Sequence, residues 1–207
     1  MRPLPRVHAF TDAVIAGGSE FGIRAAAIAA AGPAVALHAR ARGESAAMLT
    51  ALALRLVALA RPPEAAVFVS ARSDVAAAVG ATGIQLAKDD LSPSDARRVF
   101  RDGWIGQSVH SRDEAEKAVR ERSDFLVVGN VYESDTHPGR PGAGLDLVRV
   151  TSGLGVPVIA IGGITPDRAA EVRAAGAYGV AAIRALWSAP DPAAATLALL
   201  APWMDET

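Results

Sequence analysis

Apolar residues along this chain form eight short runs, and stretches of helical character lie between most of them. The runs are continuous rather than alternating with polar residues, which is typical of parallel strands covered on both faces. The pattern therefore predicts eight strands, at residues 7–12, 34–40, 65–71, 83–87, 104–110, 124–132, 156–163 and 178–186.

Capping residues mark several helix starts. Residues 92–93 and 165–166 each place a capping side chain before a proline, which suits the first turn of a helix. Ser111 followed by Glu114 has the spacing of a capping box. We expect helices at residues 21–31, 45–60, 74–79, 93–100, 112–121 and 166–175, and a last one from about residue 192.

This alternation of strands and helices defines the expected fold class. Eight βα units in 207 residues, without a GxGxxG turn, predict an α/β protein with a compact (β/α)8 TIM barrel. A doubly wound open sheet is the alternative. No linker interrupts the pattern, so residues 1–207 are expected to form a single barrel domain.

Composition narrows the possible partners. The chain has no cysteine, which rules out disulfides, a thiolate nucleophile and a cysteine-based zinc site. Its net charge of −1 favours neither nucleic acid nor an anionic membrane as a partner. The first residues lack the apolar run of a signal peptide, and the Ala-rich stretches are too short to span a membrane. We expect a cytoplasmic protein.

The clearest candidate site follows the seventh strand. Gly162 and Gly163 end that strand, and Thr165 then opens a helix. Glycines allow close approach to the backbone, and the amides at a helix start attract an anion, so the stretch predicts a phosphate site. Arg184, at the end of the eighth predicted strand, adds positive charge. The alternative is a tight turn that uses glycine for steric reasons alone.

Other polar residues follow neighbouring strands. His38 and Arg40 lie two apart and share a face of the second strand, where they are expected to contact an anion or a ring. Ser108 is expected to donate a hydrogen bond inside the barrel mouth, whereas His110 is expected to be structural.

A second polar group, Lys88-Asp89-Asp90, follows the fourth strand. One of these carboxylates could bind Mg²⁺ together with substrate phosphates. The alternative is that Asp89, Asp90 or Ser92 caps the next helix.

Several motifs in order resemble one family. The stretches VHAFTD, IGQSVHSRDEAEKA, DFLVVGNVYESD and VPVIAIGGITPDRAAEVRAAGAYGVAAI are similar to landmarks of the thiamine phosphate synthase / TenI superfamily, and they cover nearly the whole chain. The resemblance implies a compact TIM barrel with a phosphate site at Gly162 and Gly163.

Thiamine phosphate synthases, one branch, join a pyrimidine pyrophosphate to a thiazole phosphate with Mg²⁺. Their motifs include an Asn-Asp pair after the third strand, Gln-x-Arg-x-Lys on the second, and Thr-x-Thr-Lys after the sixth. Here Ser70-Ala71 stands at the first motif and residues 38–42, HARAR, at the second. Residues 134–137, SDTH, stand at the third, which aligns Thr136 with substrate-binding Thr and His137 with Lys.

The TenI branch is the closer resemblance, on SVHS, VYESD and GRPGAGLD. It includes thiazole tautomerases, which move a proton without metal. Asn130 stands at the position of the tautomerase's catalytic His, and an amide accepts no proton at neutral pH. The candidate catalytic residues are therefore His137 and His38, with Asn130, Ser108, Arg40 and Thr136 contacting the substrate.

These observations favour a TenI-like protein of thiamin metabolism that binds a small phosphorylated heterocycle, a thiazole phosphate, and tautomerises it without metal or other cofactor. The alternatives are a Mg²⁺-dependent thiamine phosphate synthase, for which Mg²⁺ would be needed, and a non-catalytic regulatory relative that only binds the ligand. The chain would thus be an isomerase or a transferase if it is an enzyme. By resemblance to the family, it could form a homodimer.

Overall fold

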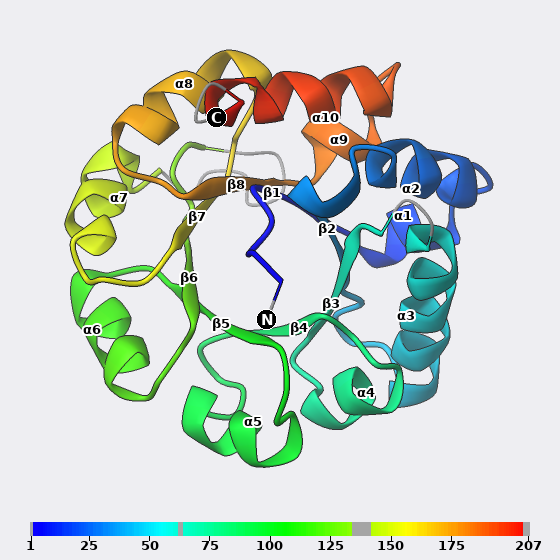
Figure 1. Ribbon diagram of the computed structural model, residues 1–207, viewed down its shortest axis with the longest axis horizontal. Helices are drawn as coiled ribbons and strands as arrows, with labels where there is room; N and C mark the ends of the chain where they lie inside the picture. Colours follow the sequence, from blue (N-terminus) through cyan, green and yellow to red (C-terminus); the bar gives the residue numbers. More distant parts are fainter. Residues whose placement is uncertain (1, 62–63, 134–141, 205–207) are drawn as a thin grey trace.

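Eight parallel strands close into a barrel in the computed structural model, which describes residues 2–61, 64–133 and 142–204. Each strand pairs with its neighbour in the sequence, and β8 pairs with β1. The helices surround this barrel (Figure 1). The predicted (β/α)8 fold is confirmed. The strands are β1 (Val7–Phe10), β2 (Val35–Ala39), β3 (Ala66–Ser70), β4 (Gly83–Leu86), β5 (Trp104–Val109), β6 (Phe125–Val128), β7 (Val158–Ile161) and β8 (Gly179–Ala182).

The helices include each one that the sequence predicts. No helix within the described residues has the length and apolar character needed to cross a bilayer. The α-helices are α1 (Ala13–Gly17), α2 (Phe21–Ala29), α3 (Ala46–Ala60), α4 (Ser73–Ala78), α5 (Pro93–Val99), α6 (Arg112–Arg120), α7 (Gly144–Ser152), α8 (Pro166–Ala174), α9 (Arg184–Trp187) and α10 (Pro192–Leu200), with 3-10 turns η1 (Gly32–Ala34) and η2 (Ala201–Trp203).

Helices α1, α7 and α9 are absent from the sequence prediction. No side chain caps α7 or α9, so neither has a recognisable start, and α1 and α9 are too short to show a period. Strand β8 ends at Ala182, and Arg184 begins α9. The prediction that Arg184 lies at the end of the eighth strand is therefore wrong, because this residue belongs to the short helix that follows the strand.

The predicted caps hold in part. Ser92 and Ser111 each accept a backbone N–H three residues later. The Glu114 carboxylate, however, accepts from the backbone N–H of His110 rather than from that of Ser111, and Thr165 makes no side-chain capping bond. The capping box is therefore shifted by one residue.

Two phenylalanines fill the barrel interior opposite two glycines. Phe68 and Phe125 are fully buried and contact each other edge to face, with ring centroids 5.8 Å apart. A Cβ on Gly83 would lie 2.2 Å from the Phe68 ring, and one on Gly106 would lie 2.1 Å from the Phe125 ring. Glycine on β4 and β5 thus makes room for the rings of β3 and β6.

A pair of buried histidines completes this interior. His8 Nε2 donates to the Pro5 carbonyl at 3.0 Å, so His8 Nδ1 accepts from His38 Nε2 at 2.8 Å. The His38 ring stacks between Phe10, at 3.8 Å between centroids, and Phe68, at 4.9 Å. Burial lowers the pKa of His8 to about 4, and burial with the nearby His8 lowers that of His38, so both rings are neutral.

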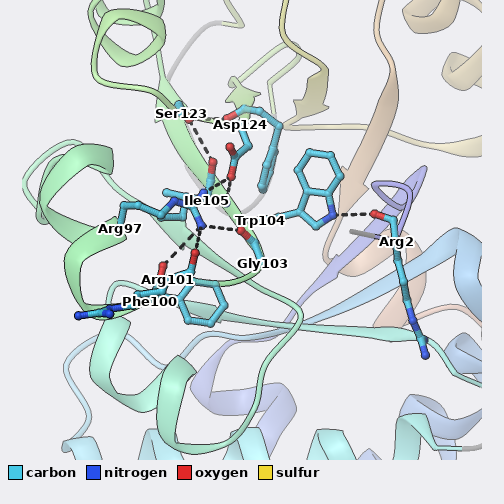
Figure 2. Close-up of polar contacts among 10 residues, drawn as sticks. Arg2, Arg97, Phe100, Arg101, Gly103, Trp104, Ile105, Ser123 and Asp124 are labelled. Atoms are coloured by element: carbon cyan, nitrogen blue, oxygen red, sulfur yellow. Dashed lines mark hydrogen bonds and ion pairs between the residues drawn. The ribbon is translucent and has the colours of Figure 1, made fainter.

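The N-terminal segment crosses the end of the barrel where the strands begin (Figure 1). Leu4 packs into the interior, and its carbonyl accepts the Tyr178 hydroxyl at 2.8 Å. The Trp104 indole donates to the Arg2 carbonyl at 3.1 Å, as Figure 2 shows. This end is closed, so any ligand must enter from the opposite end.

Arg97 ties α5 to the starts of β5 and β6, as Figure 2 also shows. Its guanidinium donates to the Gly103 carbonyl at 2.8 Å and pairs with the Asp124 carboxylate. Asp124 in turn accepts the Ile105 N–H at 2.7 Å. The network stabilises the closed end, away from the strand tips that could hold a site.

Substituting Gly106→Ala is expected to destabilise the fold by about 1–3 kcal/mol, because the new methyl group overlaps the Phe125 ring in a packed interior. Gly17→Ala is the matched control, since a Cβ there meets nothing within 4 Å. Urea unfolding of the three proteins measures the difference. Equal midpoints for Gly106→Ala and Gly17→Ala would contradict the packing argument.

The histidine pair predicts a pH dependence of stability. Because the folded pKa of His8 lies below the unfolded value of 6.5, its stabilisation is complete above pH 6.5 and is lost as the pH falls toward 4, by roughly 3 kcal/mol in all. Urea unfolding from pH 7.5 to 4.5 measures this slope. His8→Gln should show a smaller slope, even if it is less stable at pH 7.5, and an unchanged slope would exclude His8 as its origin.

Candidate active site

A cavity of about 730 Å³ opens at the carboxyl ends of the strands. Its volume lies within the range usual for small-molecule sites. Residues that follow β2, β4, β5, β6, β7 and β8 line it, and Phe10 of β1 contributes a ring. The closed end and the open cavity together place any site where TIM barrels usually carry one.

Six of the predicted site residues line this one cavity. They come from five different strand ends that are far apart in the sequence, so the fold brings them together. They are Arg40, Ser108, Asn130, Gly162, Gly163 and Arg184.

The other three predicted site residues are not found among those that line the cavity. His38 is fully buried in the barrel interior, stacked on Phe10, and is not among the cavity-lining residues. Its Nδ1 has no partner within the described residues, and burial keeps the ring neutral. The prediction that His38 contacts the substrate is therefore not supported by its position. Thr136 and His137 lie outside the described residues.

Arg40 and Arg42 follow β2. The Thr11 hydroxyl accepts the Arg40 N–H at 2.9 Å and donates to the His38 carbonyl, which fixes the backbone at this strand end. The Arg40 guanidinium makes one long contact, 3.5 Å, to the Thr11 carbonyl. Burial, and then the charge of Arg42, lower the pKa of Arg40, while Asp12 opposes the effect. Two crowded cations at the edge of a cavity favour an anion.

A chain of polar side chains crosses the floor between β3 and β5. The Ser70 hydroxyl donates to Gln85 Oε1 at 3.4 Å, and Gln85 Nε2 donates to the Ser108 hydroxyl at 2.6 Å. Gln85 and Ser108 line the cavity, whereas Ser70 does not. Because Ser108 accepts from Gln85, its own hydrogen can point to a ligand.

Lys88 and Glu114 form an ion pair at the cavity edge, 2.8 Å apart. Each shifts the other's pKa, raising that of Lys88 and lowering that of Glu114. His110 also lines the cavity, and its Nδ1 donates to the Gly129 carbonyl. The sequence predicts His110 to be structural; it makes this structural bond and lines the cavity as well.

The turn after β7 depends on its glycines. Gly162 has φ +103° and Gly163 φ +62°, a region that favours glycine. A Cβ on Gly163 would lie 2.6 Å from the Glu133 carbonyl oxygen, and one on Gly162 would lie 2.6 Å from Asn130 Cβ. The turn therefore packs directly against the segment after β6. Helix α8 begins just beyond it and points its first amides at the same end of the barrel.

Arg184 lies at the start of α9, about half exposed, 3.5 Å from the Asp12 carboxylate. Asp12 also caps α1, since its other oxygen accepts the Ile15 N–H at 2.8 Å. The long ion pair leaves the guanidinium at the cavity edge, where a ligand could compete for it.

Asn130 follows β6, and its carbonyl accepts the Ala143 N–H at 2.8 Å. Gly144 donates likewise to the Val131 carbonyl at 2.9 Å. The two ends of the segment between residues 133 and 142 are thus joined at the cavity edge. The Asn130 side chain donates to the Tyr132 carbonyl at 3.4 Å.

Arg168 is a cavity residue that the sequence did not suggest. It donates to the Gly163 carbonyl at 2.7 Å, and its guanidinium lies 4.5 Å from the centre of the Tyr132 ring. The Tyr132 hydroxyl donates to Glu171, and burial together with that carboxylate raises the pKa of Tyr132 to about 12. The sequence could have indicated this residue, because Arg168 is the third residue of the helix predicted to follow the two glycines.

The cavity lining is cationic overall. Five cationic side chains and three carboxylates line it, and those carboxylates come from three separate βα units. Within the described residues, no three His, Asp or Glu side chains gather closely enough to hold a metal ion. The cations are Arg40, Arg42, Lys88, Arg168 and Arg184, and the carboxylates are Asp89, Glu114 and Glu133.

The fold and this cavity define a class, the (β/α)8 barrel with a cation-lined small-molecule site at the carboxyl ends of its strands. Within that class, residues 8–186 match the family described as thiamine monophosphate synthase. The chain belongs to this family.

Similar proteins agree with this placement. The chain is 42% identical to the thiamine-phosphate synthase of Thermus thermophilus over 173 residues, 83% of this chain and 84% of that protein. It is 36% identical to that of Chloroflexus aurantiacus over 199 residues, 95% and 91% of the two chains. The solved thiamine phosphate pyrophosphorylase from Pyrococcus furiosus superposes with a TM-score of 0.81 at 31% identity, over 95% and 94% of the two chains.

These comparisons correct the leading sequence hypothesis. The superfamily is confirmed, but the relatives are named thiamine-phosphate synthase and do not specifically support the TenI branch. The hypothesis of a metal-free tautomerase is wrong. Of the residues in SVHS and VYESD that favoured it, Ser108, His110 and Glu133 line the cavity.

Arg168→Met is expected to lower stability by about 1–2 kcal/mol, because it removes the bond to the Gly163 carbonyl and the contact with Tyr132 while keeping an apolar stem. Arg98→Met is the control, since that side chain is 83% exposed and makes only a 3.8 Å ion pair within its own helix. Thermal unfolding checks both. Equal losses in the two variants would mean that Arg168 does not support the turn.

Proposed function

We propose that this protein is a thiamine-phosphate synthase, which couples a pyrimidine diphosphate to a thiazole phosphate and releases diphosphate. The observation that carries the proposal is the 42% identity to a thiamine-phosphate synthase over most of both chains. The cation-lined cavity supports it, because both substrates are anionic and both must reach one site.

The thiazole phosphate fits the turn between β7 and α8. Gly162 and Gly163 have no room for a Cβ and leave their backbone accessible on the cavity side. The amides at the start of α8 add the partial positive charge of a helix N-terminus. Arg184 stands across the same opening and supplies a full charge. This part of the cavity would hold the phosphate while the ring points inward.

The rings would lie deeper, between Phe10 and the polar floor. Phe10 offers an aromatic face that its stacking on His38 holds in place. Ser108, which already accepts from Gln85, can donate to a ring nitrogen, and Asn130 lines the cavity beside Gly162. These contacts would orient the two rings for bond formation.

The Mg²⁺ implied by resemblance to the synthases does not fit the residues present. Ser70-Ala71 stands where the family has an Asn-Asp pair, and neither residue lines the cavity. Asp90 closes its own turn by accepting the Ala87 N–H at 2.6 Å, and it does not line the cavity either. The described carboxylates form no metal-binding group. No step of the proposed reaction is therefore assigned to a metal.

The proposed coupling breaks the carbon–oxygen bond between the pyrimidine methylene and diphosphate, and the electron pair leaves with diphosphate. The thiazole ring nitrogen forms the new bond to that carbon. Cationic side chains at the edge of the cavity would stabilise the negative charge that develops on the leaving group. Both substrates are charged and do not cross membranes, so a cytoplasmic location is part of this proposal. That the protein forms a homodimer stays a prediction.

The test is to incubate purified protein with the two precursors, once with Mg²⁺ and once with EDTA, and to measure thiamine phosphate as its fluorescent oxidation product. Product above the no-enzyme rate in either buffer is expected. Binding of both precursors without product in either buffer would contradict a synthase and favour a non-catalytic relative.

Arg184→Ala is expected to raise the KM for the thiazole phosphate about 10- to 100-fold with little change in kcat, since it removes one charged contact to the phosphate. The control is Arg149→Ala, because Arg149 lies on α7, pairs with Asp146 of the same helix and does not line the cavity. An unchanged KM in Arg184→Ala would remove Arg184 from the phosphate site.

A further inference from the structure

Three cations flank β3 at the cavity edge. Arg40 and Arg42 follow β2, Lys88 follows β4, and β3 lies between these two strands in the barrel. Neighbouring strands are about 5 Å apart, so long side chains from β2 and β4 can meet over the end of β3. The three cations therefore border the cavity on either side of the end of β3, which, among the described residues, contributes nothing to the cavity lining. The Arg40 guanidinium contacts the Thr11 carbonyl, and the Lys88 ammonium pairs with Glu114.

The end of β3 itself offers no ligand for a metal. The Ser70 hydroxyl is engaged with Gln85, and the methyl group of Ala71 cannot coordinate. In the turn after β4, Asp90 accepts the Ala87 N–H. Asp89 is the one carboxylate of this region, among the described residues, that lines the cavity without an ion pair. A single carboxylate is a poor site for Mg²⁺ unless a substrate supplies the other ligands.

We propose that the diphosphate of the substrate is held here by Arg40, Arg42 and Lys88 without a divalent metal, and that Ala71 is the position that makes the site metal-independent. The identity of the ligand as a substrate rests on the proposed function. The binding of diphosphate itself does not, and the two can be tested separately.

The state of Arg40 supports this assignment. Its guanidinium is partly buried and has one hydrogen bond, at 3.5 Å, within the described residues. Burial and the neighbouring Arg42 lower its pKa, which means that the charged form of the guanidinium is disfavoured here. A diphosphate oxygen pair would relieve both effects, because guanidinium binds phosphate through two parallel hydrogen bonds.

Lys88 is held differently. Its ammonium group is mostly exposed and pairs with Glu114, which also accepts the backbone N–H of His110. An ammonium has three donors, so it can keep Glu114 and still contact an anion. Glu114 thus positions Lys88 at the edge of the cavity. The site keeps a net positive charge, since Arg40 and Arg42 add two further cations.

The experiment is calorimetric titration of the full-length protein with inorganic pyrophosphate in EDTA and again in Mg²⁺. We expect binding in EDTA, with affinities in the two buffers that agree within about threefold. Arg42→Ala should weaken binding in EDTA by about tenfold or more. Arg72→Ala is the matched control, because Arg72 lies beside β3, pairs with Asp74 and does not line the cavity.

Ala71→Asp tests the metal argument directly. Residue 71 has φ +67°, which Asp and Asn tolerate better than most residues, so the change suits the backbone. We expect Ala71→Asp to bind pyrophosphate about tenfold or more tightly in Mg²⁺ than in EDTA. Ala71→Asn, which has the same shape without the charge, should behave like the wild type. This comparison also corrects for the Mg²⁺ that pyrophosphate binds in solution.

Pyrophosphate binding by the wild type in Mg²⁺ but not in EDTA would overturn the proposal, as would an Ala71→Asp protein with the same buffer ratio as Ala71→Asn. Coupling of the two precursors that requires Mg²⁺, together with no binding in EDTA, would leave the proposed function standing and remove this inference. Binding in EDTA without coupling would do the reverse.

Discussion

The structure depends on how the inside of a small barrel is filled. Strands of four to six residues enclose a narrow space, and each ring that enters it must be matched by a missing side chain on the next strand. Phe68 with Gly83, and Phe125 with Gly106, are two such matches. The His8–His38 pair fills what remains and is hydrogen-bonded to itself and to the Pro5 carbonyl. A packed interior makes the barrel a rigid floor, and the chemistry is confined to the strand tips above it.

This packing explains which sequence predictions succeeded. Continuous apolar runs and regular helix starts determine a (β/α)8 barrel, and a barrel brings all its carboxyl strand ends to one opening. Arg40, Ser108, Asn130 and the two glycines could therefore be gathered from the sequence without any contact being known. The sequence pattern did not indicate how deep in the barrel a residue of a strand lies. His38 and Arg40 share a face, but His38 lies in the packed interior, whereas Arg40, two residues further along the chain, lines the cavity.

The remaining differences come from local features that carry no period. Helix α7 starts at Gly144 without a capping side chain, and α9 is a single turn that moves Arg184 off the strand. Arg168 reaches the cavity from a helix and not from a strand end, so a search limited to strand tips missed it. The tautomerase hypothesis failed for a related reason. It weighed short motifs such as SVHS and VYESD, whereas the similarity to synthases extends over most of the chain.

A site for two phosphorylated substrates must bind several negative charges without leaving its own charges uncompensated when empty. A bound metal is one solution, because it brings positive charge together with the ligand, and its absence leaves carboxylates that repel the substrate. Guanidinium groups are another, and here burial, together with the charge of the neighbouring Arg42, lowers the pKa of Arg40. By resemblance to the synthase motif, Ala71 stands where a carboxylate is expected, so this region carries one negative charge fewer. A neutral residue at position 71 and two arginines nearby act in the same direction, and both favour an anion over a metal ion at the end of β3.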